Sequence, residues 1–330
     1  MKMKRILYAV QGTGNGHVAR AREIIPILKK YGQIDVLLSA DQSHVDLGHE
    51  IQYRCAGLTF LYDKNGGISY WKTLIKNDPI RLLRDIWSLP VIDYDLVVVD
   101  FEFTAAWACR IRGVPSIALG HQAAFLSERT PRPPKRRWWG EWILKWYAPC
   151  ERIMGFHFQP YDSSIETPVI RSEVRNLHPE NKGHYTVYLP AFGDAELSRV
   201  LSPFHNIDWE VFSRSTSTTY RSGNLLFRPI DNDLYLESLR NCSGVLMSAG
   251  FEGPSEALFL GKKLCVLPIK GQYEQMCNAA ALDSFGVHVL SDLSDTQKIR
   301  QWIDSPPIGR FDFPDRTEAL VRRHIFDLDE

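Results

Sequence analysis

The 330-residue sequence lacks a surplus of charge, a membrane-spanning run and a paired-cysteine motif. Lys plus Arg and Asp plus Glu both number 39, and this balance argues against a nucleic-acid partner, which favours a basic surface. No run approaches the roughly 18 apolar residues of a membrane span. The six cysteines form no CxxC pair, so we expect reduced thiols in a cytoplasmic protein.

Two further absences concern chemistry and targeting. No DxD pair stands at the end of an expected strand, so we predict neither a metal nor another cofactor. The N-terminal "MKMKRILYAVQGTGNG" joins basic residues to a short apolar run without a small-residue cleavage site. It therefore predicts a first strand rather than a signal peptide.

The sequence does contain two series of apolar runs alternating with helical patterns. Expected strands of the first series lie at 5–10, 34–40, 94–103 and 115–120, and helices at 17–31, 79–89 and 104–113. Expected strands of the second lie at 184–192, 208–214, 224–230, 244–250 and 263–269, and helices at 194–204, 232–241, 252–261 and 273–286. Runs of Val, Ile and Leu without polar alternation suit parallel strands covered on both faces. The pattern predicts an α/β protein with two doubly wound, Rossmann-like sheets.

A polar, turn-rich stretch at 160–180 separates the two series and predicts a domain boundary there. We expect a first domain over 1–165 and a second over 166–310. The last segment, 311–330, contains a short helical pattern that we expect to pack back on the first domain.

The loop "QGTGNGHVARAREIIPIL" follows the first expected strand and places Gly12, Gly14, Gly16 and His17 in succession. Glycines let the backbone approach an anion, and a helix N-terminus offers N–H groups. No lysine follows, so the loop is not a phosphate-binding P-loop. His17 is expected at the carboxyl edge of the sheet, where open α/β sheets bind ligands. It is either a general base that accepts a hydroxyl proton or an exposed turn residue.

Three other polar residues follow strands that we expect to end at the same edge. Asp100 and Glu102 close "DLVVVDFEF", and His121 follows "PSIALG". One of the two carboxylates can orient His17, as buried carboxylates do beside catalytic imidazoles. A structural helix cap is the alternative for either carboxylate, and His121 is a candidate for acceptor binding.

The stretch "SGVLMSAGFEGPSEALFLGKKLCVLPIKGQYEQMCNAAAL", residues 243–282, holds a second constellation. A strand ends near Ser248, and a helix begins near Pro254, which suits a first helical turn. That helix N-terminus can hold a diphosphate. Glu256 in its first turns can accept the hydroxyls of a ribose, or it is a solvated helix residue.

The two constellations together resemble the GT-B glycosyltransferases that use nucleotide sugars. "GTGNGH" is similar to the first loop of the MurG-like group, which transfers N-acetylglucosamine to a lipid-linked cell-wall precursor. The second constellation is similar to the donor-binding half of the same enzymes. The resemblance implies two Rossmann-like domains that face an interdomain cleft, with the acceptor on the N-terminal side and the donor on the C-terminal side.

The resemblance also implies roles for single residues. Gly14 and His17 match the loop that faces the cleft, and Glu256 matches a ribose-binding glutamate. Ser248, Gly250 and Phe251 match the turn whose backbone faces the diphosphate. Gln275 matches the residue that contacts the donor sugar, and Glu274 precedes it. Ile230 ends the segment that matches the nucleobase-binding region. The loop "LPAFGDAE" departs from the family's Gly-Gly-Ser type.

Cations precede a group of tryptophans in "RPPKRRWWGEWILKWYAPCER". Trp138, Trp142 and Trp146 share one helical face behind a basic segment. This combination is typical of a membrane interface, so 132–147 is a candidate for peripheral contact at the inner face of the membrane. A core helix with a basic cap is the alternative.

These observations leave three functional hypotheses. The first is a metal-independent, inverting glycosyltransferase that uses a UDP-linked sugar, His17 as base and a sugar or lipid-linked acceptor. The second is an epimerase or hydrolase of nucleotide sugars with the same fold. The third is a protein that binds sugar nucleotides without turnover.

Overall fold

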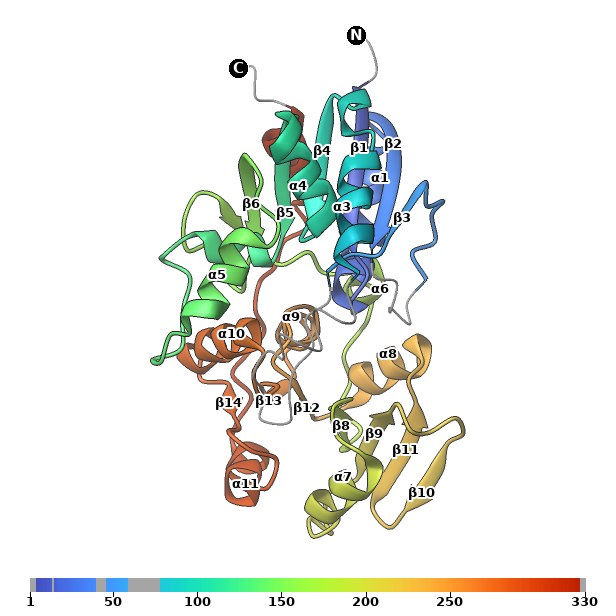
Figure 1. The fold of residues 1–330 in the computed structure, drawn as a ribbon. Coiled ribbons are helices and arrows are strands. Elements are labelled where there is room, and N and C mark those ends of the chain that lie inside the picture. Colours follow the sequence, from blue (N-terminus) through green and yellow to red (C-terminus); the bar gives the residue numbers. More distant parts are fainter. Residues whose placement is uncertain (1–3, 14, 40–45, 59–77, 327–330) are drawn as a thin grey trace. The chain divides into compact units, whose positions relative to one another are not determined.

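The computed structural model describes residues 4–13, 15–39, 46–58 and 78–326 (Figure 1). The chain divides into two compact units, which we describe separately. Unit 1 comprises residues 1–130, 135–171 and 314–330, and unit 2 comprises 131–134 and 172–313. Unit 2 is thus inserted into the sequence of unit 1.

Unit 1 is built on a sheet of seven parallel strands in the order β3-β2-β1-β4-β5-β6-β7. The strands are β1 (Lys4–Gln11), β2 (Gly32–Ser39), β3 (Tyr53–Cys55), β4 (Leu96–Asp100), β5 (Ser116–Gly120), β6 (Arg152–Phe156) and β7 (Ile165–Glu166). The helices are α1 (Asn15–Leu28), α3 (Pro79–Ser88), α4 (Phe103–Arg112), α5 (Trp138–Trp146) and α12 (Thr317–Val321), with short segments η1 (Val91–Asp93), η2 (Gln122–Leu126) and η3 (Arg322–Phe326).

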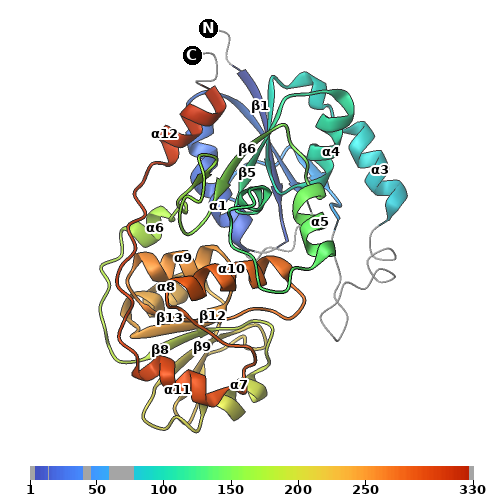
Figure 2. The ribbon, with the colours of Figure 1, turned by 90° about the vertical axis from the view of Figure 1, so that its left-hand side faces the viewer.

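The central strands of unit 1 are covered on both faces, as their apolar composition requires. Figure 2 shows α1 and α12 on one side of this sheet and α3, α4 and α5 on the other. α12 packs on α1, where Lys30 Nζ lies 2.6 Å from Glu318 Oε2 and Tyr31 stacks on Phe326.

Unit 2 repeats the plan with the strand order β10-β11-β9-β8-β12-β13-β14, in which β10 alone pairs in the antiparallel sense. The strands are β8 (Tyr185–Tyr188), β9 (Trp209–Ser213), β10 (Tyr220–Ser222), β11 (Leu225–Pro229), β12 (Gly244–Ser248), β13 (Lys263–Leu267) and β14 (His288–Val289). The helices are α6 (Ser172–Arg175), α7 (Asp194–Leu201), α8 (Asn232–Asn241), α9 (Glu252–Phe259), α10 (Tyr273–Ser284) and α11 (Thr296–Asp304). α7 and α11 cover one face of this sheet, and α8, α9 and α10 cover the other (Figure 2).

A buried lysine fastens the end of α8 in unit 2. The Lys262 ammonium donates to the backbone carbonyls of Glu180 and Arg240, both at 2.6 Å, and of Cys242 at 2.8 Å. Its side chain is 5% exposed. Two of these carbonyls lie at the C-terminal end of α8, where the helix dipole favours a cation.

The predicted α/β class with two doubly wound sheets is confirmed, with local corrections. The strand expected over 94–103 stops at Asp100, because Phe101 adopts a left-handed backbone with φ of 49°. The helix expected from 17 to 31 runs instead from Asn15 to Leu28. The short edge strands β3, β7, β10 and β14, together with β6 and α11, were not expected, because most of these are too short to show a period.

Candidate active site

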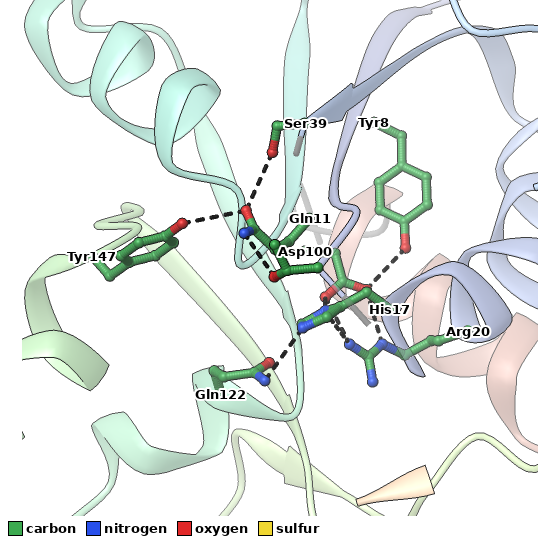
Figure 3. Close-up of polar contacts among 9 residues, drawn as sticks. Tyr8, Gln11, His17, Arg20, Ser39, Asp100, Gln122 and Tyr147 are labelled. Atoms are coloured by element: carbon green, nitrogen blue, oxygen red, sulfur yellow. Dashed lines mark hydrogen bonds and ion pairs between the residues drawn. The ribbon is translucent and has the colours of Figure 1, made fainter. Parts of the chain in front are cut away.

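His17 and Asp100 meet at the point where the strand order of unit 1 reverses. β2 lies on one side of β1 and β4 on the other, and such a switch point is where open α/β sheets bind ligands. His17 lies in the first turn of α1, directly after β1, and Asp100 ends β4. His17 Nδ1 lies 2.7 Å from Asp100 Oδ1 (Figure 3). The structure therefore brings together the two residues that we expected to act as base and orienting carboxylate.

This contact fixes how the imidazole can act. The Asp100 carboxylate is fully buried, and because it is an anion it can only accept from Nδ1–H, so in the neutral tautomer that fits this contact the lone pair lies on Nε2. The side chain of His17 is 13% exposed, and the amide nitrogen of Gln122 approaches its Nε2 at 3.5 Å. His17 thus has the tautomer that can accept a proton through Nε2.

Arg20, one helical turn after His17, holds the other side of the carboxylate. Its Nε lies 2.9 Å from Asp100 Oδ2 and its Nη2 lies 2.6 Å from Oδ1, a bidentate pair. The Tyr8 hydroxyl lies 3.4 Å from Oδ2. Burial acts to raise the pKa of Asp100, but Arg20 and His17 hold it below its ordinary value. Asp100 is therefore a carboxylate anion that keeps its position.

The backbone around the dyad contains one strained residue. Phe101 takes φ of 49°, a left-handed conformation that costs a residue with a side chain about 1–2 kcal/mol. Its ring lies nearly parallel to the His17 ring, with centroids 6.4 Å apart, and stacks on Tyr147 at 4.6 Å. Because of this turn, Asp100 contacts His17, whereas Glu102 contacts the first backbone N–H groups of α4.

Glu102 and His121 have structural roles in unit 1. Both carboxylate oxygens of Glu102 accept backbone N–H groups of α4, from Thr104 at 2.8 Å and Ala105 at 2.6 Å. Glu102 is therefore the helix cap that we considered as its alternative, and burial raises its pKa. His121 is 1% exposed, and its Nδ1 lies 2.9 Å from the carbonyl of Phe156.

The glycine loop is held from its strand end. Gly12 N–H donates to the carbonyl of Ser39 at 2.6 Å, and Gln11 contacts the hydroxyls of Ser39 and Tyr147 (Figure 3). Gly16 lies in the first turn of α1, whereas Gly14 lies outside the described residues. Because Gly12 is buried and bonded within the sheet, its backbone N–H is not directed at a ligand.

Unit 2 has its own switch point, between β8 and β12. Here β12 ends at Ser248, and α9 begins after Phe251, whose side chain gives the helix no capping hydrogen bond. A Cβ atom added at Gly250 would meet no atom of the described residues within 4 Å. Asn278 fastens the turn by donating from Nδ2 to the carbonyl of Ala249 at 3.1 Å. The helix N-terminus beside Gly250 therefore offers a place for an anion.

The other predicted donor-side residues lie around the same edge of unit 2. Glu256, in α9, is 4% exposed. Glu274 and Gln275 lie in the first turn of α10, and Gln275 Oε1 accepts from the backbone N–H of Ile269 at 2.9 Å. Ile230 follows β11 and is half-buried. Gln275 thus supports the turn before α10, a role that we did not expect.

The tryptophan-rich helix exposes two of the three tryptophans on its shared face, and Trp146 is half-buried. Trp138 and Trp142 are 77% and 58% exposed, and α5 packs instead through Leu144. A core role for these two tryptophans is therefore excluded. On the same side of the unit 1 sheet, α3 exposes Trp87, which is 62% exposed. In the part of the chain that the structure describes, no helix is both long and apolar enough to cross a membrane.

The two Rossmann-like units have the fold of the GT-B type that solved glycosyltransferase structures share. The chain belongs to glycosyl transferase family 1, whose sequence model matches residues 4–307. The expected resemblance to MurG-like GT-B enzymes is confirmed. No curated protein matches the chain significantly in sequence.

Solved structures with little sequence identity share the fold. The glycotransferase of kitacinnamycin has a TM-score of 0.61 at 14% identity, over 98% of this chain and 95% of its own. Arabidopsis thaliana UGT89C1, solved with UDP, has a TM-score of 0.60 at 14% identity, over 97% and 93%. MurG of Acinetobacter baumannii has a TM-score of 0.55 at 12% identity, over 97% and 95%.

Proposed function

We propose that this glycosyltransferase transfers a sugar from a UDP-linked donor to an acceptor hydroxyl with inversion and without a metal ion. The observation that carries the proposal is the 2.7 Å contact between His17 Nδ1 and Asp100 Oδ1, which leaves Nε2 as a base at the switch point of unit 1. Similar structures were solved with UDP, with UDP-2fluoro-glucose and with thymidine diphosphate, and we propose UDP because two of the three contain it.

The proposed reaction is a single displacement. His17 Nε2 takes the proton of the acceptor hydroxyl, and the oxygen attacks the anomeric carbon from the face opposite the diphosphate. The bond between that carbon and the diphosphate oxygen breaks, and the nucleoside diphosphate leaves with both electrons. Asp100 stabilises the imidazolium that forms, and we propose that the α9 N-terminus stabilises the departing phosphate charge.

A donor and acceptor screen tests this function. Purified protein is incubated with UDP-, TDP- and GDP-sugars, and melting temperatures identify the donor, because ligand at 100 times its Kd adds about 2.7 kcal/mol. Transfer to acceptors is then followed with and without EDTA. Disaccharide or glycoside formation that survives EDTA supports the proposal. Epimerised donor, free sugar, or binding without turnover supports one of the two alternatives instead.

Donor binding in unit 2 gives a mutational test at Glu256. We propose that its carboxylate accepts the ribose hydroxyls, so Glu256→Ala should weaken UDP binding by about 1.5–3 kcal/mol, the value of a charged hydrogen bond. Isothermal calorimetry measures the change. The control is Glu237→Ala, which removes an exposed carboxylate from α8. Equal affinity of the Glu256 variant and the wild type would remove this residue from the donor site.

The exposed face of α5 supports a second proposal, that unit 1 contacts the inner face of the membrane to reach a lipid-linked acceptor. Trp138 and Trp142 are exposed, and the segment before them contains Arg132, Lys135, Arg136 and Arg137. Such a surface attracts anionic lipid while tryptophans enter the headgroup layer.

Vesicle binding tests this contact. Sedimentation with vesicles rich in phosphatidylglycerol should retain the wild type, whereas Trp138→Ser with Trp142→Ser should abolish retention at an unchanged melting temperature. Trp138 and Trp142 are exposed, so their replacement should not unfold the protein. An unchanged melting temperature therefore distinguishes loss of membrane contact from loss of folding. The contact is refuted if the wild type itself does not sediment with anionic vesicles.

A further inference from the structure

We propose that Arg20 is a positioning residue that balances the charge of Asp100, so that His17 remains unprotonated and ready to accept a proton. The inference rests on the proposed role of His17 as the base. The sequence pattern did not single out Arg20, although it follows His17 by one helical turn.

The geometry of Arg20 is that of a fixed counter-ion. Its side chain is buried, with 2% of its area exposed, and its guanidinium holds both oxygens of Asp100 at 2.9 and 2.6 Å. The same Nη2 lies 3.2 Å from His17 Nδ1. One cation therefore contacts both members of the dyad from the side opposite Nε2 (Figure 3).

The charges around the dyad explain what this counter-ion does. The groups of unit 1 that face Asp100 are Tyr8 from β1, His17 and Arg20 from α1, and the uncharged Gly120 from β5. Burial raises the pKa of Tyr8 well above its ordinary value, so this phenol stays neutral. The positive charge of Arg20 and the negative charge of Asp100 then cancel. His17 therefore lies beside a pair whose charges cancel, and this is the basis of the proposal.

Removing Arg20 would reverse this balance. Asp100 would become an uncompensated buried anion 2.7 Å from an imidazole, and the nearest way to neutralise it is a proton on His17. The resting enzyme would then hold an imidazolium, which cannot accept the acceptor proton. Arg20 thus weakens the attraction of Asp100 for a proton on His17 in the resting enzyme, while the 2.7 Å contact with Asp100 still orients the ring.

A glycine preserves the space that this pair occupies. A Cβ atom built on Gly120 would lie 2.9 Å from Asp100 Oδ1 and 3.3 Å from Arg20 Nη2. Since real Cβ atoms do not approach an oxygen so closely, any side chain there would displace the ion pair. The absence of a side chain at Gly120 therefore leaves the space that the Arg20–Asp100 ion pair occupies.

The experiment measures the pH midpoint of the His17 ring titration by NMR, with the signal assigned from its loss in His17→Gln. Arg20→Gln should raise the midpoint by about one to three pH units, the usual effect of one close charge. Arg20→Lys keeps the charge and should stay within about half a unit of the wild type. The matched control is Arg22→Gln, which removes an exposed cation from the same helix and should change little because solvent screens it.

A double variant separates charge balance from structural damage. Arg20→Met combined with Asp100→Asn removes both charges, so its midpoint should return to within about one unit of the wild type. A structural role alone would disturb the double variant at least as much as the single one. If Arg20→Gln does not fold, Arg20→Lys and the double variant decide. An unmoved midpoint in Arg20→Gln, or an equally raised one in the double variant, overturns the proposal.

The pH dependence of kcat/KM then distinguishes this inference from the proposed function. If His17 is the base, the ascending limb of the profile should move upward in Arg20→Gln by the same amount as the NMR midpoint. A shifted NMR midpoint with an unshifted profile would show that Arg20 controls the proton on His17 but that His17 is not the base. The NMR result needs no substrate, so it stands even if no transfer is found.

Discussion

Replacing His17 with alanine is expected to lower kcat by about 10²–10⁴-fold, the usual contribution of a positioned general base. Donor affinity should change little, because we assign the donor to unit 2. The reason is the proposed geometry, in which Asp100 holds His17 Nδ1 at 2.7 Å and leaves Nε2 for the acceptor hydroxyl. Initial rates at saturating donor, with UDP affinity from calorimetry, measure the two effects separately.

The control for this prediction is His205→Ala, which removes an exposed histidine from unit 2 and should leave both quantities unchanged. Full transfer activity in His17→Ala would make His17 a turn residue, and the base would then have to be sought at Asp100. Loss of donor affinity instead of turnover would show that the glycine loop holds phosphate and would reverse the proposed assignment of the two units.

The largest expected effect on stability is at Lys262. Lys262→Met leaves three backbone carbonyls without the ammonium that they share, and hydrogen bonds to charged groups contribute about 1.5–3 kcal/mol each. Burial lowers the pKa of Lys262, which means that desolvation of the ammonium offsets part of this gain. We therefore expect a net loss of about 2–4 kcal/mol.

Hydrogen exchange in increasing urea measures this loss on the peptides of β12 and β13. The neighbouring Lys263→Met is a matched control, because its ammonium donates to one carbonyl only, that of Ile303 at 2.8 Å. It should cost about 1 kcal/mol or less. Equal losses in the two variants would mean that the cluster of carbonyls at the end of α8 needs no cation.

The approach of His17 to a carboxylate at the end of β4 was predictable because it depends on two simple features. Both residues follow apolar runs that form parallel strands, and the carboxyl ends of parallel strands share one edge. The alternating runs likewise gave the two sheets. Neither conclusion needs any knowledge of side-chain contacts.

The separate roles of Asp100 and Glu102 were not predictable from the sequence. Two carboxylates two residues apart would point the same way in a continuous strand. The left-handed turn at Phe101 breaks that alternation, and Glu102 then caps α4. A backbone conformation this uncommon for a residue with a side chain gives no pattern in the sequence.

Arg20 was missed for a different reason. A helix periodicity places its side chain on a buried face, where a charged residue is expected only with a partner. That partner, Asp100, lies 80 residues away in the chain. The spacing of three residues between His17 and Arg20 was the one available signal, and it has no meaning until the position of Asp100 is known.

The return of the chain to α1 has a consequence for biosynthesis. Residues 172–313 of unit 2 leave the ribosome before 314–326, which supply α12 and its contacts with Lys30 and Tyr31. Unit 2 can therefore fold while the nascent unit 1 still lacks the segment that buries Val321 and Ile325 against it. A truncated chain that ends after residue 313 would contain all of unit 2 but lack α12, which would leave the α1 face of unit 1 open to proteolysis.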